Sequence, residues 1–540
     1  MLSYRKLAMR VLGRPLHTGG NDSPRPASQR AAAFVLTAAM LTTLAAPAFA
    51  GTWHIENGDI TISAGESGND VTQNNVTTKN DTNTIITNEN KDIASSHTVT
   101  IDAGNDKVEV TLEDVNIKAD SGSALISNGD VTLTLKGDNS LTGGISGNGS
   151  GRNGIASSGS LTISGGTVTA NGGDGDNGIY SSGSVTISGG STVTANGGNG
   201  TISGGNGIYS DSGDVTISGG STVTAKGGDG GSFGGGSGIS SFNRVAISGS
   251  TVTANGGDSS SNSGGYGISS LDVAISSGTV TANGGDSKDG SGGNGIYSSS
   301  GVAISGGAVT ANGGDSKDGS GGNGIYSSSS VAISGGTVTA TGGDSTGSDG
   351  SGGNGIYSRN GSIDLSGSLE LTAKAGSPNG KALSQNGSEL VLDTIKDKLG
   401  PGAKVTATDA DGKVIDQVST PRPVEPEESS SSSDGGSAAP SAPVSPLPGL
   451  TVTDKDGQRI SYTSTQSGNT LTVCVGRFTA SFRISLAALR QLRAEGIDTI
   501  TFQTVLCSTT LSVDELLAMG GEDAEAVLTH RLTDSSLTVG

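Results

Sequence analysis

Residues 293–315 read Gly293-Asn-Gly-Ile-Tyr-Ser-Ser-Ser-Gly-Val-Ala-Ile-Ser-Gly-Gly-Ala-Val-Thr-Ala-Asn-Gly-Gly-Asp315, and residues 322–344 repeat them almost letter for letter. The isoleucine of the Gly-Ile pair marks each copy of this unit. It recurs at intervals of 24, 29, 31, 29, 28, 29 and 31 residues, at Ile155, Ile179, Ile208, Ile239, Ile268, Ile296, Ile325 and Ile356. A period in this range is typical of solenoids, propellers and other arrays.

The units contain short β-type runs between glycine turns and no helical periodicity, which favours an all-β parallel β-helix, right-handed by the crossover rule. In the unit that begins at Gly178, we expect strands at 179–181, 185–187 and 192–195. Side chains alternate across a strand, so each inward position should form a column from coil to coil, as Val185, Val215 and Val245 do. About ten coils are expected. The alternative is low-complexity disorder, which suits the 93 glycines and 3% aromatic residues but not the fixed offsets of the apolar positions.

Five segments are expected along the chain. Residues 1–50 combine basic residues, an alanine-rich apolar run and the sequence Ala48-Phe49-Ala50, the pattern of a cleaved signal peptide. An N-terminal cap with irregular first coils should occupy 51–123, with Trp53 in the cap, and the regular β-helix with its closing coils 124–418. A linker rich in proline and serine at 419–448 precedes a small α+β domain at 449–540, whose helices should begin after Ser485 and Ser512.

The formal net charge is -20. Removal of a leader that carries six basic residues and one aspartate would leave -25. Such a chain repels nucleic acid and anionic membranes, so neither is expected as a partner. We expect a protein that is secreted or held on the extracellular cell surface, with no membrane insertion after signal cleavage.

Acidic loops separate the third strand of each unit from the next Gly-Ile pair. Asp286, Asp315 and Asp344 recur at intervals of 29 residues, and Asp289 should lie over Asp318. Ca²⁺ takes such carboxylates in flexible geometry and would relieve their repulsion, so it is the cofactor that these five residues indicate. The alternative is that they are solvated turn residues.

Two further columns flank the Gly-Ile pair. Asparagines precede it at 153, 177, 206, 294, 323 and 354, and we predict an internal ladder of side-chain hydrogen bonds. Tyrosines follow it and should point outward; they are Tyr180, Tyr209, Tyr297, Tyr326 and Tyr357. A row of exposed rings could stack against sugars or stabilise the sheet itself, and both interpretations remain open.

The Thr-x-Thr pairs of the third strands predict a flat hydroxyl-bearing face, similar to those of ice-binding β-helices, although threonine is also an ordinary solvent-facing strand residue. Catalysis has little support, because the candidate side chains are scattered: His17, His54, His97, His530, Arg152, Arg244 and Arg359. The two cysteines, Cys474 and Cys507, could form one disulfide in an exported protein, or stay as two buried thiols.

The units Gly293–Tyr297, Val185–Gly190 and Thr192–Ala195, with the opening Gly58–Ile62, resemble a family of secreted bacterial β-helix proteins with a pectate-lyase-like fold and a carbohydrate-binding role. The resemblance covers residues 51–418. It implies non-catalytic, calcium-assisted binding of a polysaccharide or cell-surface glycan, and no site residue of the family matches a specific position here.

The leading functional hypothesis is therefore an exported glycan-binding or adhesive protein, with the acidic loops and the tyrosine column as its binding surfaces. One alternative is a polysaccharide lyase or glycoside hydrolase on the same fold. A third is a passive surface spacer that projects the C-terminal domain.

Overall fold

The computed structural model describes residues 51–144, 152–421, 449–454, 458–460, 462–467, 469–475, 479–504, 508–519, 524–530 and 535–539. The predicted signal peptide, most of the predicted linker and Cys507 lie outside these residues. The chain divides into two compact units at residue 426, and each is described by itself. Within the described ranges, no helix is both long enough and apolar enough to cross a membrane.

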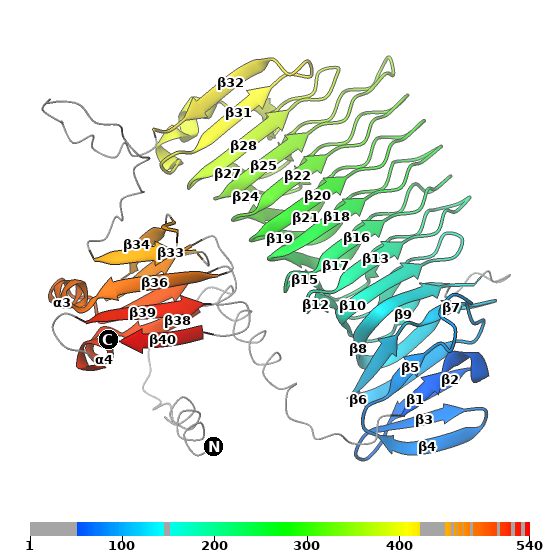
Figure 1. The fold of residues 1–540 in the computed structure, drawn as a ribbon. Helices are drawn as coiled ribbons and strands as arrows, with labels where there is room; N and C mark the ends of the chain where they lie inside the picture. Colours follow the sequence, from blue (N-terminus) through cyan, green and yellow to red (C-terminus); the bar gives the residue numbers. More distant parts are fainter. Residues whose placement is uncertain are drawn as a thin grey trace, which may run out of the picture. The chain divides into compact units, whose positions relative to one another are not determined.

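The first unit is a parallel β-solenoid of about 14 turns (Figure 1), which confirms the predicted β-helix and exceeds the ten expected coils. Three runs of strands wind around it. The first run follows the Gly-Ile pair: β9 (Ile155–Ser157), β11 (Ile179–Ser181), β14 (Ile208–Ser210), β17 (Ile239–Ile247), β19 (Ile268–Ile275), β21 (Ile296–Ile304), β23 (Ile325–Ser327), β26 (Ile356–Ser358) and β29 (Leu383–Gln385).

The second and third runs complete each turn. The second contains β10 (Leu161–Asn171), β12 (Val185–Ser188), β15 (Val215–Ile217), β24 (Val331–Ile333) and β27 (Ile363–Leu365). The third contains β13 (Thr192–Asn196), β16 (Thr222–Lys226), β18 (Ser250–Asn255), β20 (Gly278–Asn283), β22 (Ala308–Asn312), β25 (Gly336–Thr341), β28 (Leu369–Lys374) and β31 (Lys404–Thr408). Each coil was expected to contain three separate strands. In three coils a single long strand, β17, β19 or β21, belongs to both the first and the second run, and β10 belongs to both the second and the third.

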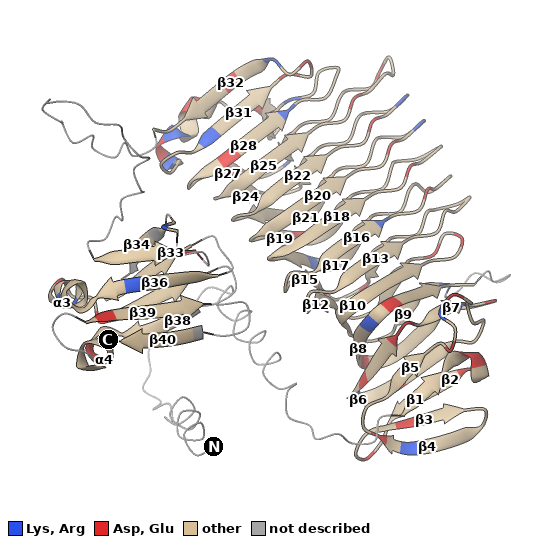
Figure 2. Ribbon diagram, viewed as in Figure 1, with Lys and Arg blue, Asp and Glu red and all other residues tan. Residues whose placement is uncertain are grey.

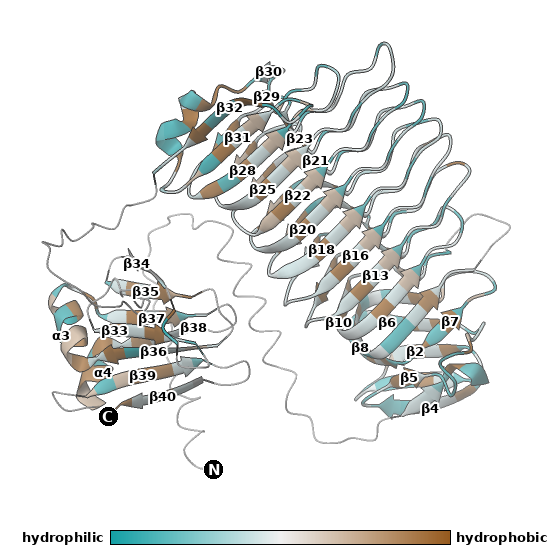
Figure 3. Cartoon of the chain, turned by 45° about the horizontal axis from the view of Figure 1, so that its top comes forward, coloured by the Kyte–Doolittle hydropathy of each residue, from teal (hydrophilic) through white to brown (hydrophobic). Residues whose placement is uncertain are grey.

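The predicted columns form in register. Val185 pairs with Val215, which pairs with Val245, and all three are buried. The isoleucines of the Gly-Ile pairs stack likewise, as Ile296 does on Ile325. Each such side chain contributes about 1.5–3 kcal/mol when it leaves water, so a narrow core of small side chains is stabilised by repetition. Figure 3 shows apolar residues on the strands and hydrophilic residues on the loops.

Glycines turn the chain for two different reasons. Gly189 and Gly190 have φ angles of 66° and 70°, the left-handed conformation that glycine adopts without strain. Gly198 has no such angle, but a Cβ atom there would lie 1.7 Å from the carbonyl oxygen of Gly173 in the preceding coil. Gly198 and its neighbour Gly197 therefore permit close approach of adjacent loops, a reason that was not predicted from the sequence.

Antiparallel strands close the solenoid at its two ends (Figure 1). At the N-terminal end, β2, β3 and β4 form a meander, and Trp53 packs against the core as expected of a cap. This end contains β1 (Thr52–His54), the 3-10 helix η1 (Ile55–Asn57), β2 (Ile60–Ala64), β3 (Asn69–Gln73), β4 (Val76–Asp81), β5 (Ile85–Thr87), β6 (Val99–Glu113), β7 (Asn116–Lys118) and β8 (Leu125–Thr142). The other end contains β30 (Ser388–Glu389), the 3-10 helix η2 (Leu392–Lys398) and β32 (Val414–Ser419), which pairs antiparallel with β31.

The second unit is α+β with its own core. One sheet has the order β33 (Leu450–Thr453), β36 (Ala480–Ser485), β39 (Glu525–His530) and β40 (Ser535–Val539), and the other β34 (Thr463–Ser467), β35 (Thr470–Cys474), β37 (Thr499–Gln503) and β38 (Ser508–Ser512). The two predicted helices are confirmed as α3 (Leu486–Ala494) and α4 (Val513–Met519). Ser485 Oγ accepts the Ala488 N–H and Ser512 Oγ the Glu515 N–H, so the expected N-caps are present.

Candidate functional site

The acidic loops form a column of carboxylates along one edge of the solenoid. The aspartate column consists of Asp229, Asp258, Asp286, Asp315 and Asp344. Each Oδ1 accepts the backbone N–H of the next member, at 3.1, 2.9, 2.8 and 2.7 Å. In Figure 2 the strands of the central coils are mostly free of charge, and charged residues gather on the loops. The predicted alignment of Asp286, Asp315 and Asp344 is thus present, and it holds adjacent loops together.

The other two predicted metal ligands belong to a neighbouring position. Lys288 Nζ lies 3.8 Å from Asp289 Oδ1, and Asp318 donates its backbone N–H to the Lys288 carbonyl oxygen at 2.9 Å. Burial raises the pKa of Asp286, and the like charges of Asp258 and Asp315 add to the rise. Among the described residues, no three His, Cys, Asp or Glu side chains converge on a point that could hold a metal ion. The edge is a row of carboxylates, and calcium binding there stays a prediction.

The asparagine ladder forms as predicted. Asn323 donates its backbone N–H and its Nδ2 to Asn294 Oδ1 at 2.8 and 2.9 Å, and Asn354 does the same to Asn323 Oδ1 at 2.9 and 2.8 Å. A second ladder, which was not predicted, lies at the end of the third strand in three successive coils. There Asn312 Nδ2 donates to Asn283 Oδ1 at 2.8 Å, and Asn283 Nδ2 to Asn255 Oδ1 at 2.7 Å. The side chains of these asparagines are therefore engaged in hydrogen bonds between coils.

A groove of about 990 Å³ opens on the same loop edge near its N-terminal end. Arg152 comes from the segment before β9, Asp174 and Asp176 from the loop before β11, Asn199 and Thr201 from the loop before β14. The remaining lining residues are Gly175, Gly200, Ile202, Ser203, Asp229, Gly230, Gly231 and Ser260. Successive loops stack in register, with Gly200 paired to Gly230, so five neighbouring segments, before β9, β11, β14, β17 and β19, build one concave surface.

Arg152 and Asp176 form the charged centre of the groove. Arg152 Nε lies 3.4 Å from Asp176 Oδ2, the Arg152 side chain is 14% exposed, and its Nε atom is buried without a hydrogen-bond acceptor. Burial raises the pKa of the Asp176 carboxyl, Arg152 opposes the rise and Asp174 adds to it. From the sequence the basic residues are too scattered to predict a site, because loops of unequal length hide the proximity of Arg152 to Asp176.

Two exposed apolar side chains lie beside these polar groups. Ile202 lines the groove and is 60% exposed, and Phe233 is 76% exposed. The Phe233 N–H donates to the Ile202 carbonyl oxygen at 2.8 Å, so the two residues are neighbours on adjacent loop tips. Ile202 thus adds an apolar side chain to a groove that is otherwise polar, and Phe233 lies on the adjacent loop tip outside the groove lining.

The predicted tyrosines stack on one another. Tyr297 lies between Tyr266 and Tyr326, with ring centroids 4.7 and 5.2 Å apart and ring planes within 8° and 4° of parallel. Tyr357 packs edge-on against Tyr326, with centroids 5.4 Å apart. Both faces of Tyr297 are therefore covered by protein. This geometry favours the sheet-stabilising interpretation over a platform for sugars.

Two members of this aromatic column were not anticipated. The strand positions in register with the tyrosines hold Ser240 and Ser269. Tyr266, three residues before Ser269, stacks on Tyr297 instead. Phe242, two residues after Ser240, lies 6.2 Å from Tyr209, which in turn lies 5.7 Å from Tyr180. Neither ring occupies the repeat position of the tyrosines, so the period of the sequence does not predict that these two rings join the column.

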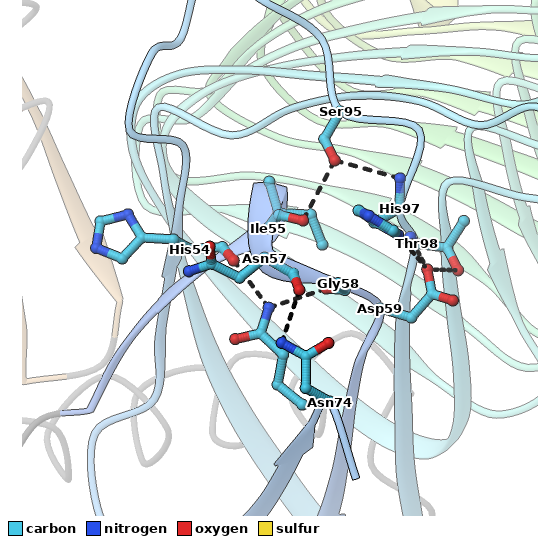
Figure 4. Close-up of polar contacts among 10 residues, drawn as sticks. His54, Ile55, Asn57, Gly58, Asp59, Asn74, Ser95, His97 and Thr98 are labelled. Carbon is cyan, nitrogen blue, oxygen red and sulfur yellow. Dashed lines mark hydrogen bonds and ion pairs between the residues drawn. The ribbon is translucent and has the colours of Figure 1, made fainter. Parts of the chain in front are cut away.

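The histidines of the N-terminal end do not form a catalytic relay (Figure 4). His97 Nδ1 lies 3.4 Å from Asp59 Oδ1, but Ser95 Oγ donates to the Ile55 carbonyl oxygen and accepts the backbone N–H of His97, each at 3.2 Å. The His54 ring points away from this group in Figure 4. The Ser95 hydroxyl is thus held by backbone groups rather than by an imidazole base.

Two other predicted features have a mixed outcome. The Thr-x-Thr face forms in register, with Thr192 beside Thr222 and Thr194 beside Thr224; whether it binds ice stays a hypothesis. Cys474 carries a free thiol in the structure, and its Sγ lies 3.4 Å from Gln503 Oε1. Since Cys507 lies outside the described residues, the disulfide also stays a prediction.

In comparisons with known proteins, no family model, curated protein or solved structure matches the chain. The assignment of function therefore rests on the groove and the loop edge alone.

Proposed function

We propose that the chain is an exported glycan-binding protein and that the groove around Arg152 is its binding site. The observation that carries the proposal is the composition of that groove. Carboxylates, an amide and hydroxyls from four loops surround about 990 Å³ of space, and Ile202 adds an exposed apolar side chain. Convergent polar groups with one apolar contact offer hydrogen bonds to a ligand that is itself rich in polar groups.

The chemistry of these groups suits a saccharide. Sugar hydroxyls both donate and accept, so they can pair with Asp174, Asn199 and Thr201 in the same site. The C–H face of a sugar ring is apolar and can lie against Ile202 or the Phe233 ring. The tyrosine column is not the binding platform in this proposal, because its central rings cover each other.

The basic, then apolar, N-terminal sequence and the strongly acidic remainder support export and solubility in contact with neutral or cationic partners. We propose a secreted or cell-surface location. In this proposal calcium assists binding but is not required, since one oxygen of each carboxylate in the aspartate column already accepts a backbone N–H.

A glycan array with the mature chain, in calcium and in chelator, tests the proposal. We expect at least one class of polysaccharide to bind, and Phe233→Ala or Ile202→Ala to weaken binding about tenfold through loss of the apolar contact. Phe242→Ala is the matched control, because Phe242 is 67% exposed but belongs to the aromatic column. Binding that needs Phe242 and not Phe233 would reject the groove, and absence of any binding would reject the function.

A polysaccharide lyase or glycoside hydrolase is the second candidate, and one observation favours it. Arg152, Asp174 and Asp176 occur together at one place on the rod, and burial raises the Asp176 pKa above its ordinary value, the direction that favours a proton donor. Release of oligosaccharides from a bound polymer, abolished by Asp176→Asn and retained in Asp411→Asn of the β31–β32 turn, would establish it. Binding without product release supports the non-catalytic proposal.

A further inference from the structure

We infer that the groove selects a saccharide with free amines, that is, a cationic amino sugar, over its uncharged or uronic counterparts. This inference rests on the proposed function of the groove and names the chemical class of its ligand.

The charge balance of the groove is negative. Asp174, Asp176 and Asp229 line it against the single cation Arg152. Arg152 Nε lies 3.4 Å from Asp176 Oδ2 without a hydrogen bond, and the Arg152 side chain is only 14% exposed, so little of the guanidinium faces the groove. A ligand carboxylate would have to displace Asp176 from a largely buried pair, which leaves an unpaired charge behind. The groove therefore does not have the form of an anion receptor.

The other two carboxylates of the groove, Asp174 and Asp229, are placed where they can contact a cationic ligand. Asp174 is exposed beside Asp176. Asp229 donates its backbone N–H to Asn199 Oδ1 at 2.8 Å, and its own Oδ1 accepts the Asp258 N–H at 3.1 Å. These bonds fix the orientation of the Asp229 carboxylate, so a ligand amine can meet its second oxygen at little cost in side-chain entropy.

The loop edge extends the same preference beyond the groove. Asp258, Asp286, Asp315 and Asp344 continue the column one coil at a time from Asp229. A polymer that leaves the groove along this edge passes a row of negative charges, which attracts repeated amines and repels repeated carboxylates. The apolar Ile202 and the hydroxyls of Thr201 and Ser203 suit a sugar ring better than a bare metal ion.

The test uses the mature full-length chain and three oligosaccharides of equal length: a glucosamine oligomer, its fully N-acetylated form and a galacturonate oligomer. Calorimetric titration at low salt should show the free-amine oligomer binding about tenfold more tightly than the N-acetylated one, and more weakly as salt is added. Asp174→Asn should weaken binding of the amine form about fivefold and leave the N-acetylated form within twofold. Asp411→Asn, an exposed change in the β31–β32 turn, should alter neither affinity.

The outcomes separate the two proposals. Equal binding of the amine and N-acetylated oligomers, or tightest binding of galacturonate, overturns the charge inference and leaves glycan binding intact. If no oligomer and no array glycan binds, the proposed function fails with it. A preference for the amine form that survives Asp174→Asn and Asp229→Asn together places selection elsewhere and also overturns the inference.

Discussion

Asp315 donates its backbone N–H to the Oδ1 of Asp286 at 2.8 Å, one full coil away along the chain. Each carboxylate in this position therefore accepts a hydrogen bond from the next coil, and the like charges lie in a line along the solenoid. The hydrogen bonds of these side chains stabilise the solenoid, and the repulsion between their charges destabilises it. Substitutions that separate the two effects are the direct way to measure them.

Asp286→Ala should lower the stability of the solenoid by about 1 kcal/mol, because the Asp315 N–H loses its acceptor. Asp286→Asn keeps an acceptor oxygen and removes the charge, so it should be neutral or slightly stabilising at pH 7. Urea unfolding followed by the fluorescence of Trp53, the single tryptophan, measures the difference. Equal losses in the two variants would mean that the charge, not the hydrogen bond, matters at this position.

The same column predicts a pH dependence. The pKa of Asp286 in the folded chain is raised above its ordinary value of 3.8, chiefly by burial; the hydrogen bond from the Asp315 N–H opposes the rise, and the charges of Asp258 and Asp315 add to it. The folded state then binds the proton more tightly than the unfolded state, so stability falls as pH rises from 3.8 through the raised pKa. The urea midpoint of the natural chain should fall relative to that of Asp286→Asn across this window, and the two should converge below it. A difference that stays constant from pH 3 to 7 contradicts the argument.

Tyr297 should act as a structural ring. Its replacement by alanine removes two stacked contacts and should cost about 1–3 kcal/mol, while Tyr297→Phe keeps the rings and should cost little. Neither change should alter glycan affinity, because both ring faces are covered in the folded chain. Thermal unfolding by circular dichroism measures the change in stability, and glycan titration of the same samples measures the affinity. A Tyr297→Phe variant that folds but binds glycan more weakly would show that the tyrosine column takes part in binding.

Gly314 should tolerate no side chain. A Cβ atom there would lie 2.0 Å from the Gly285 carbonyl oxygen, so Gly314→Ala forces adjacent loops apart. Gly301→Ala is the matched control, because its nearest contact would be an ordinary 3.7 Å. We expect a loss of at least about 2 kcal/mol for the first and less than about 0.5 kcal/mol for the second. Hydrogen exchange of the loop amides should report the local opening.

The sequence predicted the solenoid because its strongest signal, identical apolar residues at a fixed period, is also its core: Val302 lies on Val331 as the repeat requires. It predicted the Asn294 to Asn323 ladder for the same reason. It missed the β3–β4 hairpin, since Val76–Asp81 is mostly exposed and carries no inward alternation. It also missed the groove. The distance from Arg152 to Asp176 depends on where irregular loops fold back, and no period encodes that.

Successive coils present nearly the same surface above and below. Two adjacent coils pair through matching residues: Tyr297 with Tyr326, Ser298 with Ser327 and Val302 with Val331. Either coil could therefore take the place of the other in the stack. Gain or loss of one whole 29-residue copy by the gene would thus change the reach of the rod and its number of edge carboxylates by one step, with no new interface to evolve. Copy number is therefore an adjustable property of this architecture, independent of the groove near one end.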